Sequence, residues 1–301
     1  MKKIAQFSVG IASRLKPQET GCNIPDEIIK EMTVIYPEGE KRRTFFVRLP
    51  TEDPRFLAIE DLLARNGYTF TNHLKMETPR STMLTVTLEF EPSDFGHHDW
   101  YEVYPSRALA DYLSRNEQGL IRNLGDRDFM LSDEENADLL AGKHDARGKI
   151  PSWAYDMVTG VGASRIMGTQ VNELLASAKF HIPTKPTTVF GLFEWDPQVI
   201  FPILSAQCQF CDPKGIPIPI DGDRSYGMVV DGFIQSPVLK YDRSAVEQVL
   251  AQHGKPDVAK TREHFGNGPE VADPIILASR RLTAWLMSHD KKLSWKPVEI
   301  I

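Results

Sequence analysis

The sequence predicts a mixed α+β fold in which repeated strand–helix–strand units, their helices capped by serine, pack on mixed sheets. Three observations support this prediction: a globular composition, short runs of alternating apolar residues, and a segment pattern that recurs along the chain. The chain has 301 residues, 41% hydrophobic and 25% charged. This composition excludes a disordered, collagen-like or disulfide-held chain and allows about two domains.

The first hundred residues are expected to form a layer of strands. The N-terminal run MKKIAQFSVGI predicts a first strand, because polar residues interrupt it too early for a signal peptide. Residues 31–37 and 42–50 are two further strand-like runs, separated by a turn-prone Pro-Glu-Gly-Glu segment. Residues 68–70 and 83–90 complete the predicted layer.

One amphipathic helix is expected within this layer. Asp53 has the side chain of a helix N-cap, and Pro54 suits the first helical position. Apolar residues follow at helical spacing, and Asn66-Gly67 supplies a stop signal. The apolar face is expected to consist of Phe56, Ile59, Leu62 and Leu63.

Charge divides the chain into three parts. Residues 1–121 are the predicted N-terminal α/β layer, 122–150 a strongly charged connection, and 151–301 a C-terminal α+β region. Ser132 and Glu135 have capping-box spacing, which predicts a short helix in the connection. An acidic surface of this kind steers a basic partner protein toward it. The candidate partner-binding residues are Asp126, Asp128, Asp133, Glu134, Glu135 and Asp138.

Two segments repeat one pattern. Residues 106–113 read SRALADYL and residues 279–286 read SRRLTAWL, each after a short apolar run. In both, a strand is expected to end at a serine that caps a helix with one apolar face. A weaker third copy begins at Val171 and ends in the extended Lys185-Pro186 exit. The alternative is that any amphipathic strand–helix–strand unit selects similar residues, so that the three segments are not a true repeat.

The closing stretch, residues 275–301, resembles the C-terminal ending of bacterial immunity-like proteins of polymorphic toxin systems, including the double-CxxCG families. The resemblance rests on an apolar strand, Ser279, a helix, and the tail Trp295-Lys296-Pro297-Val298. It implies a protein that binds and neutralises a cognate toxin. This chain departs from the double-CxxCG pattern because it has a single Cys-x-x-Cys, followed by Asp212 where that pattern has glycine.

That Cys-x-x-Cys pair, Cys208 and Cys211, has the spacing of half a structural zinc site. Zinc needs four ligands, so the fold would have to add others. The alternative is a pair of reduced thiols in a proline-rich loop. The residues available to complete a zinc site are Cys22, His181, His253 and His264.

The densest polar cluster is the segment that contains Asp94, His97, His98 and Asp99. Its functional interpretation is a general-base or metal-binding loop between two strands. The alternative is a solvated turn rich in aspartate and glycine.

Charge and cysteine usage restrict the partners and the compartment. A net charge of −6 disfavours a nucleic-acid partner. The sequence contains no apolar run of about 18 residues, so no membrane-spanning helix is expected. Its three cysteines, an odd number, do not form a secreted disulfide framework.

The sequence therefore predicts a cytoplasmic, non-catalytic scaffold that binds another protein and needs no cofactor; a zinc ion at Cys208 and Cys211 is the alternative. The alternative is a metal-assisted enzyme that uses the Asp94–Asp99 loop with these two cysteines.

Overall fold

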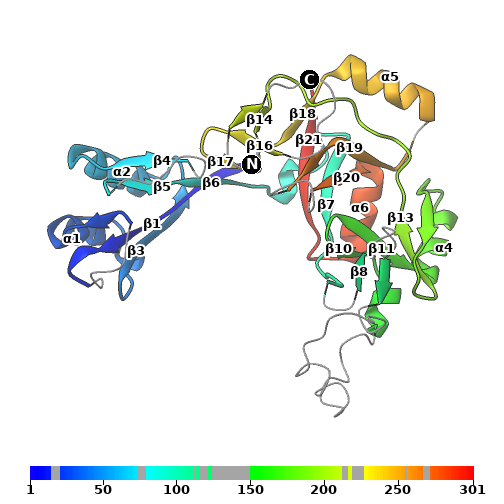
Figure 1. Cartoon of the computed structure of the whole chain (residues 1–301), viewed down its shortest axis with the longest axis horizontal. Helices are drawn as coiled ribbons and strands as arrows, with labels where there is room; N and C mark the ends of the chain where they lie inside the picture. Colours follow the sequence, from blue (N-terminus) through cyan, green and yellow to red (C-terminus); the bar gives the residue numbers. More distant parts are fainter. Residues whose placement is uncertain are drawn as a thin grey trace, which may run out of the picture.

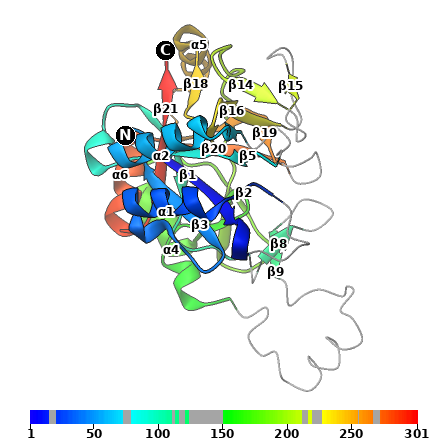
Figure 2. The ribbon, with the colours of Figure 1, turned by 90° about the vertical axis from the view of Figure 1, so that its left-hand side faces the viewer.

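The computed structural model describes residues 1–14, 21–72, 79–110, 113–115, 121–123, 150–211, 216–218, 227–254, 256–266 and 272–301. These residues form a mixed α/β fold, which confirms the predicted fold class. Figures 1 and 2 show an N-terminal lobe, residues 1–89, and a larger body, residues 100–301. The 122–150 connection lies almost entirely outside the described residues.

An eight-stranded sheet runs through the lobe and into the body. Its order is β15-β14-β16-β17-β6-β1-β2, and β3 also pairs with β1. The first strand is where the sequence predicted it. The strands are β1 (Lys2–Ile11), β2 (Asn23–Ile24), β3 (Thr44–Pro50), β6 (Thr85–Glu89), β14 (Gln209–Cys211), β15 (Pro217–Ile218), β16 (Met228–Asp231) and β17 (Ile234–Gln235).

In the lobe, two helices pack on one face of this sheet and enclose an apolar core. Alternate residues of β1 and β3, among them Phe7 and Val47, are buried against α1 (Asp26–Ile35) and α2 (Pro54–Arg65). The helix predicted from Asp53 is confirmed, because the Asp53 carboxylate accepts a hydrogen bond of 2.8 Å from the Arg55 backbone N–H. A short pair, β4 (Thr69–Thr71) and β5 (Ser81–Met83), closes the lobe.

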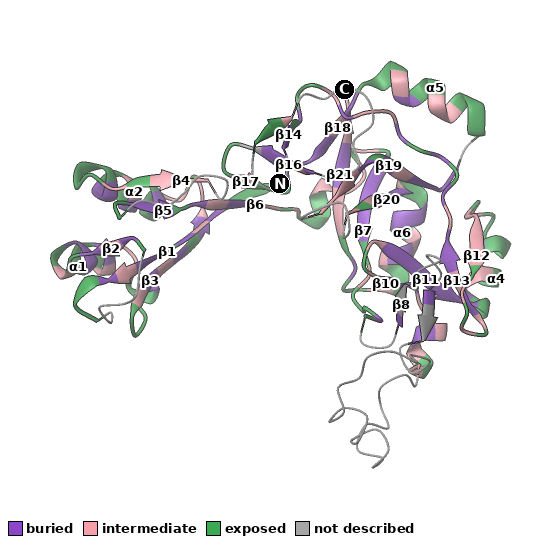
Figure 3. Cartoon of the chain, viewed as in Figure 1, coloured by how far each residue is buried: buried purple, intermediate pink, exposed green. Residues whose placement is uncertain are grey.

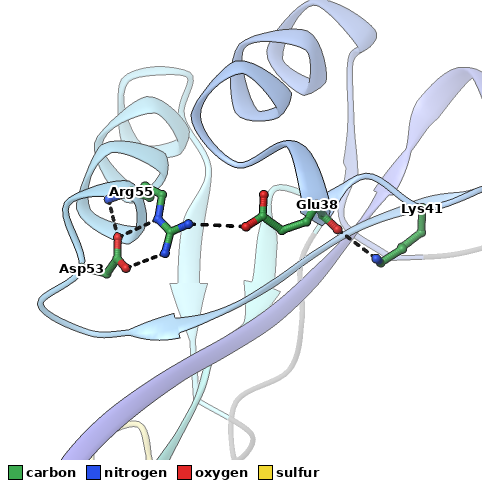
Figure 4. A network of polar contacts seen from close by, with 4 residues as sticks. All are labelled: Glu38, Lys41, Asp53 and Arg55. Carbon is green, nitrogen blue, oxygen red and sulfur yellow. Dashed lines mark hydrogen bonds and ion pairs between the residues drawn. The ribbon is translucent and has the colours of Figure 1, made fainter.

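Charged contacts connect the start of α2 to the turn before β3 (Figure 4). Arg55 Nη2 lies 2.9 Å from Asp53 Oδ2, and Arg55 Nη1 lies 3.4 Å from Glu38 Oε1. Glu38 belongs to a 3₁₀ turn, Pro37–Gly39, whose carbonyl oxygen at Glu38 accepts from Lys41 Nζ. Arg55, Glu38 and Lys41 are exposed, so their contacts orient the helix start and add little stability.

The strand predicted over residues 31–37 is wrong, because most of it belongs to α1. The apolar residues that favour a helix begin before this segment, where Ile28, Ile29 and Met32 face the core at helical spacing. Val34, in the β-branched run Thr33-Val34-Ile35 that suggested a strand, is 84% exposed and therefore does not belong to a buried strand.

The body is built around a five-stranded sheet, in the order β18-β21-β7-β20-β19, that is buried on both faces (Figure 3). Trp100 of the central strand packs on one face and Tyr101 on the other. Because β7 pairs with β20 and β21, one sheet joins residues from both sides of the 122–150 connection. The strands are β7 (Trp100–Tyr104), β18 (Leu239–Tyr241), β19 (Val258–Phe265), β20 (Asp273–Ser279) and β21 (Ser294–Ile300).

Helices and a smaller sheet cover the body. α6 (Arg280–His289) and α4 (Thr169–Ser177) pack on the Tyr101 face, and Val246 of α5 (Arg243–His253) packs on the Trp100 face. No helix of the described residues is long and apolar enough to cross a membrane. The remaining strands are β8 (Leu113–Arg115), β9 (Ile121–Asn123), β10 (Thr159–Val161), β11 (Ser164–Gly168), β12 (Thr184–Pro186) and β13 (Leu192–Trp195).

The repeat prediction is confirmed at its C-terminal copy. Ser279 accepts a hydrogen bond of 3.2 Å from the Leu282 backbone N–H and caps α6, which leads into β21. The third copy also has its helix, α4, and its exit strand, β12. Its N-cap is Gly168, however, so this helix has no side-chain cap.

The helix predicted over residues 106–113 is wrong. The Ser106 backbone N–H donates to Asp290 Oδ2 at 2.9 Å instead of lying in a first helical turn. Ala108 pairs with Gly160, and the Leu109 N–H donates to the Gly160 carbonyl oxygen at 2.7 Å. Residues 107–109 therefore lie beside β10, because tertiary hydrogen bonds outweigh the local helical pattern of the segment.

Candidate functional site

The residues of the predicted Asp94–Asp99 loop contact separate partners, Met1 at the N-terminus and two residues of the body. Asp94 Oδ1 lies 2.5 Å from the Met1 ammonium, whose hydrogen bond holds the pKa of the carboxyl below its usual range. Asp99 Oδ1 lies 3.5 Å from Arg280 Nη2, at the start of α6. The His98 ring lies edge-on to buried Tyr101. His97 adds a weaker electrostatic interaction with Asp94, and the contact with Arg280 indicates a loop that docks on α6.

Cys208 and Cys211 are both buried in the body, where Cys211 belongs to β14. The Cys208 sulfur accepts from the Lys240 backbone N–H at 3.3 Å, and the Cys211 thiol donates to the Met228 carbonyl oxygen at 3.3 Å. Burial raises the pKa of Cys208, which disfavours the thiolate that zinc requires. In the part of the chain that the structure describes, no three His, Cys, Asp or Glu side chains are grouped so that they could hold a metal ion.

The acidic candidates fall on residues outside the described part of the chain, and their surface role stays a prediction. They are Asp126, Asp128, Asp133, Glu134, Glu135 and Asp138.

A different site lies between the β16–β17 hairpin and the five-stranded sheet. A cavity of about 370 Å³, here called the hairpin cavity, opens at this junction. Lys296 and Glu102 lie on its wall, directly opposite each other on the antiparallel strands β21 and β7. Most of the rest of the wall is apolar and includes Met228, Val230, Leu239, Phe265 and Ile275.

The polar groups of this cavity contact one another in a row, from Lys296 through Glu102 to Tyr104. Lys296 Nζ lies 2.8 Å from Glu102 Oε1, and Glu102 is 0% exposed. The Tyr104 hydroxyl donates to the other Glu102 oxygen at 2.5 Å. Burial, followed by the nearby Glu102 carboxylate, raises the pKa of Tyr104, so its hydroxyl stays a donor near neutral pH. A buried carboxyl group needs fixed polar partners, and Lys296 and Tyr104 provide them for Glu102.

Lys296 also connects the sheet to the hairpin. Its ammonium donates to the carbonyl oxygens of Ser236 and Pro237, at 3.4 and 3.3 Å. Ser236 follows β17 directly and has a φ of 55°, in the left-handed region that few residues other than glycine adopt. Such strain persists where the surrounding structure determines the conformation, as it does at binding sites.

Arg165, on β11, packs against Tyr104 at the other end of this row of polar groups. Its guanidinium carbon lies 5.6 Å from the centre of the Tyr104 ring, and its Nε and Nη2 donate to the Val103 carbonyl oxygen at 3.0 and 2.6 Å. Burial lowers the pKa of Arg165 to about 10. The site therefore contains two basic side chains, Lys296 and Arg165, each held by backbone carbonyl groups, and the carboxyl group of Glu102.

Sequence reasoning missed this site, although one signal for it is present. Glu102 lies in the middle of the apolar strand WYEVY, and a charge in that position must find a buried partner. Which residue pairs with it depends on the register of β21 against β7. Comparison with protein-family models, with curated protein sequences and with solved structures finds no match to the chain.

Proposed function

We propose that the chain is a non-catalytic protein-binding scaffold, an immunity-like protein that binds a cognate toxin in the cytoplasm. In this proposal, the hairpin cavity receives an apolar side chain of the partner. The chief support is that the charged groups of the cavity contact one another and leave an apolar wall for a ligand. Lys296 Nζ has three oxygen neighbours. Of the two Glu102 oxygens, one accepts a hydrogen bond from the Tyr104 hydroxyl and the other lies in the ion pair with Lys296. A general acid or base needs access to the substrate at its reactive atom, which these contacts occupy.

The size and rigidity of the cavity also support this role. Its volume of about 370 Å³ is near the lower end of ligand pockets and accommodates a large side chain. Interfaces between proteins are dominated by a few anchors that fill such pockets. The contacts of Lys296 with Glu102 and the hairpin hold the cavity wall before the partner arrives, which reduces the entropy lost on binding.

The predicted acidic segment completes the proposal. Six carboxylates between residues 126 and 138 would attract a basic partner and raise its association rate. The hairpin cavity would then supply the specific contact. The proposed toxin is therefore a basic protein that presents an exposed apolar side chain.

The immunity-like function requires that a neighbouring gene encode a secreted protein, and the test uses that protein, purified separately. Isothermal titration calorimetry would compare the wild-type chain with Gln235→Trp. Gln235 is exposed on the cavity rim, so an indole ring at this position obstructs the opening without disturbing the core. We expect an affinity at least about tenfold weaker for this variant.

Gln248→Trp is the matched control, because Gln248 is exposed on α5 and does not line the cavity. It should bind as the wild-type chain does. Failure of the wild-type chain to form a complex would overturn the immunity-like function. Equal affinity of the wild-type and Gln235→Trp chains would instead overturn the hairpin cavity as the contact site.

A further inference from the structure

We propose that a second cavity, within the N-terminal lobe, binds a small hydrophobic amine in its ammonium form. This lobe cavity has a volume of about 300 Å³ and lies between α2, β1, β2, β4 and β5. Phe233, from the turn between β16 and β17, also lines it. The cavity is distinct from the hairpin cavity, and the proposal is independent of the protein partner.

The inner wall of the lobe cavity is apolar and rigid. Val9, Ile24 and Leu63 line it and belong to the buried core of the lobe. Phe70, also on the wall, packs against Phe7, with ring centres 4.8 Å apart. These contacts provide a fixed site for the hydrocarbon part of a ligand.

Three aromatic residues line the same cavity: Tyr68, Phe70 and Phe233. The faces of aromatic rings attract organic cations, most strongly where water is partly excluded. Phe233 is 37% exposed and therefore lies toward the mouth. Its carbonyl oxygen accepts from the Val86 N–H at 2.8 Å, which fixes its backbone against the lobe.

The charge on the wall decides between a cation and an anion. Glu60, on α2, is the only charged residue among the described residues that line the lobe cavity. Arg80 does not line the cavity, although it lies close to Gly67 and its charge acts on the wall residue Tyr68. Thr82 uses its hydroxyl to donate to the Ser8 carbonyl oxygen at 2.9 Å. An ammonium group therefore meets one carboxylate and aromatic faces, whereas an anion meets no cation of the wall.

Three probes of similar shape test this proposal: phenethylammonium, neutral phenethyl alcohol and anionic hydrocinnamate. Binding to the full chain would be measured by nuclear magnetic resonance titration, with the shifts of Tyr68 and Phe233 locating the site. We expect phenethylammonium to bind about tenfold more tightly than the alcohol, and hydrocinnamate to bind more weakly than either.

Two variants locate the charge and the cavity. Glu60→Gln should remove the preference for the ammonium over the alcohol, whereas Glu31→Gln, an exposed change on α1, should keep it. Ala64→Trp places an indole ring at an exposed position of the wall and should block all three probes.

Equal affinity for phenethylammonium and phenethyl alcohol would overturn the assignment of a cation. So would an unchanged ammonium preference in Glu60→Gln. Absence of binding by all three probes, or binding that Ala64→Trp leaves intact, would overturn the cavity itself as the site.

Discussion

The lobe and the body each contain a charge pair on their sheets, and the two pairs differ in burial. In the lobe, Arg48 of β3 contacts Glu89 of β6, and both side chains are 47% exposed. In the body, Lys296 contacts Glu102, with side-chain exposures of 15% and 0%. The first pair is solvated and replaceable, whereas the second has been removed from water and requires its partners.

The difference extends to the two cores. The lobe core consists of apolar side chains from β1, β3, α1 and α2. The body also buries charged side chains, among them Glu102, Arg165 and Glu263, whereas the buried polar side chains recorded in the described part of the lobe are the uncharged Ser81 and Thr82. The stability of the lobe should therefore depend on packing volume, and that of the body on charge.

The largest expected effect is that of Lys296→Met. This variant leaves Glu102 buried without its ammonium partner, so we expect the free energy of unfolding to fall by about 3–5 kcal/mol. Urea denaturation at neutral pH measures the loss. Arg48→Met in the lobe should cost less than about 1 kcal/mol, because its pair is exposed.

The double variant Glu102→Gln/Lys296→Met separates charge from packing. Because it removes both charges, we expect it to recover most of the stability lost in Lys296→Met. A double variant as unstable as Lys296→Met would show that the lysine stem and its carbonyl contacts, rather than the ion pair, carry the effect.

In the lobe, Ile59→Ala should lower the free energy of unfolding by about 3 kcal/mol, because Ile59 is fully buried on the inner face of α2 and its truncation leaves a void. The loss should be the same at pH 5 and pH 8, since no charge is altered. Hydrogen exchange of α2 and β1 would locate the loss in the lobe. A loss that changes strongly with pH would contradict the division between an apolar lobe and a charged body.

The features that could be predicted from sequence are those determined by neighbouring residues. Asp53 and Ser279 cap helices through backbone groups two and three positions along the chain, so their roles are visible in the local pattern. Residues 106–113 share four of eight letters with residues 279–286, yet residues 107–109 lie beside β10 instead of forming a helix. Contacts with Asp290 and Gly160, distant in sequence, decide their structure.

The hairpin cavity depends on the same kind of distant contact. Glu102 and Lys296 meet because β21 pairs with β7 in one register, and Arg165 reaches Tyr104 from a different sheet. The polar cluster that was easiest to see, Asp94–Asp99, owes its density to a loop that docks on α6. Local density of polar residues indicated a docked loop, whereas a single charge within an apolar strand marked the site.

The smallest expected effect concerns Glu263, whose side chain is buried in the body. Its Oε1 accepts from the Leu204 N–H at 2.7 Å, and burial raises the pKa of the carboxyl above its usual value. The folded chain therefore binds this proton more tightly than the unfolded chain does. The group stabilises the fold when protonated, and this contribution is lost as the pH rises through the folded-state pKa.

Glu263→Gln keeps the acceptor for Leu204 and removes the buried charge. At pH 7 we expect this variant to be more stable than the wild-type chain, by no more than about 1 kcal/mol. The difference should shrink as the pH falls toward the unfolded-state value, because the wild-type carboxyl then takes up its proton. Exposed Glu247→Gln on α5 is the control and should follow the wild-type curve. If Glu263→Gln is less stable than the wild-type chain at pH 7 but not at low pH, the carboxylate has a stabilising partner, and the contrast between the two cores must be redrawn around it.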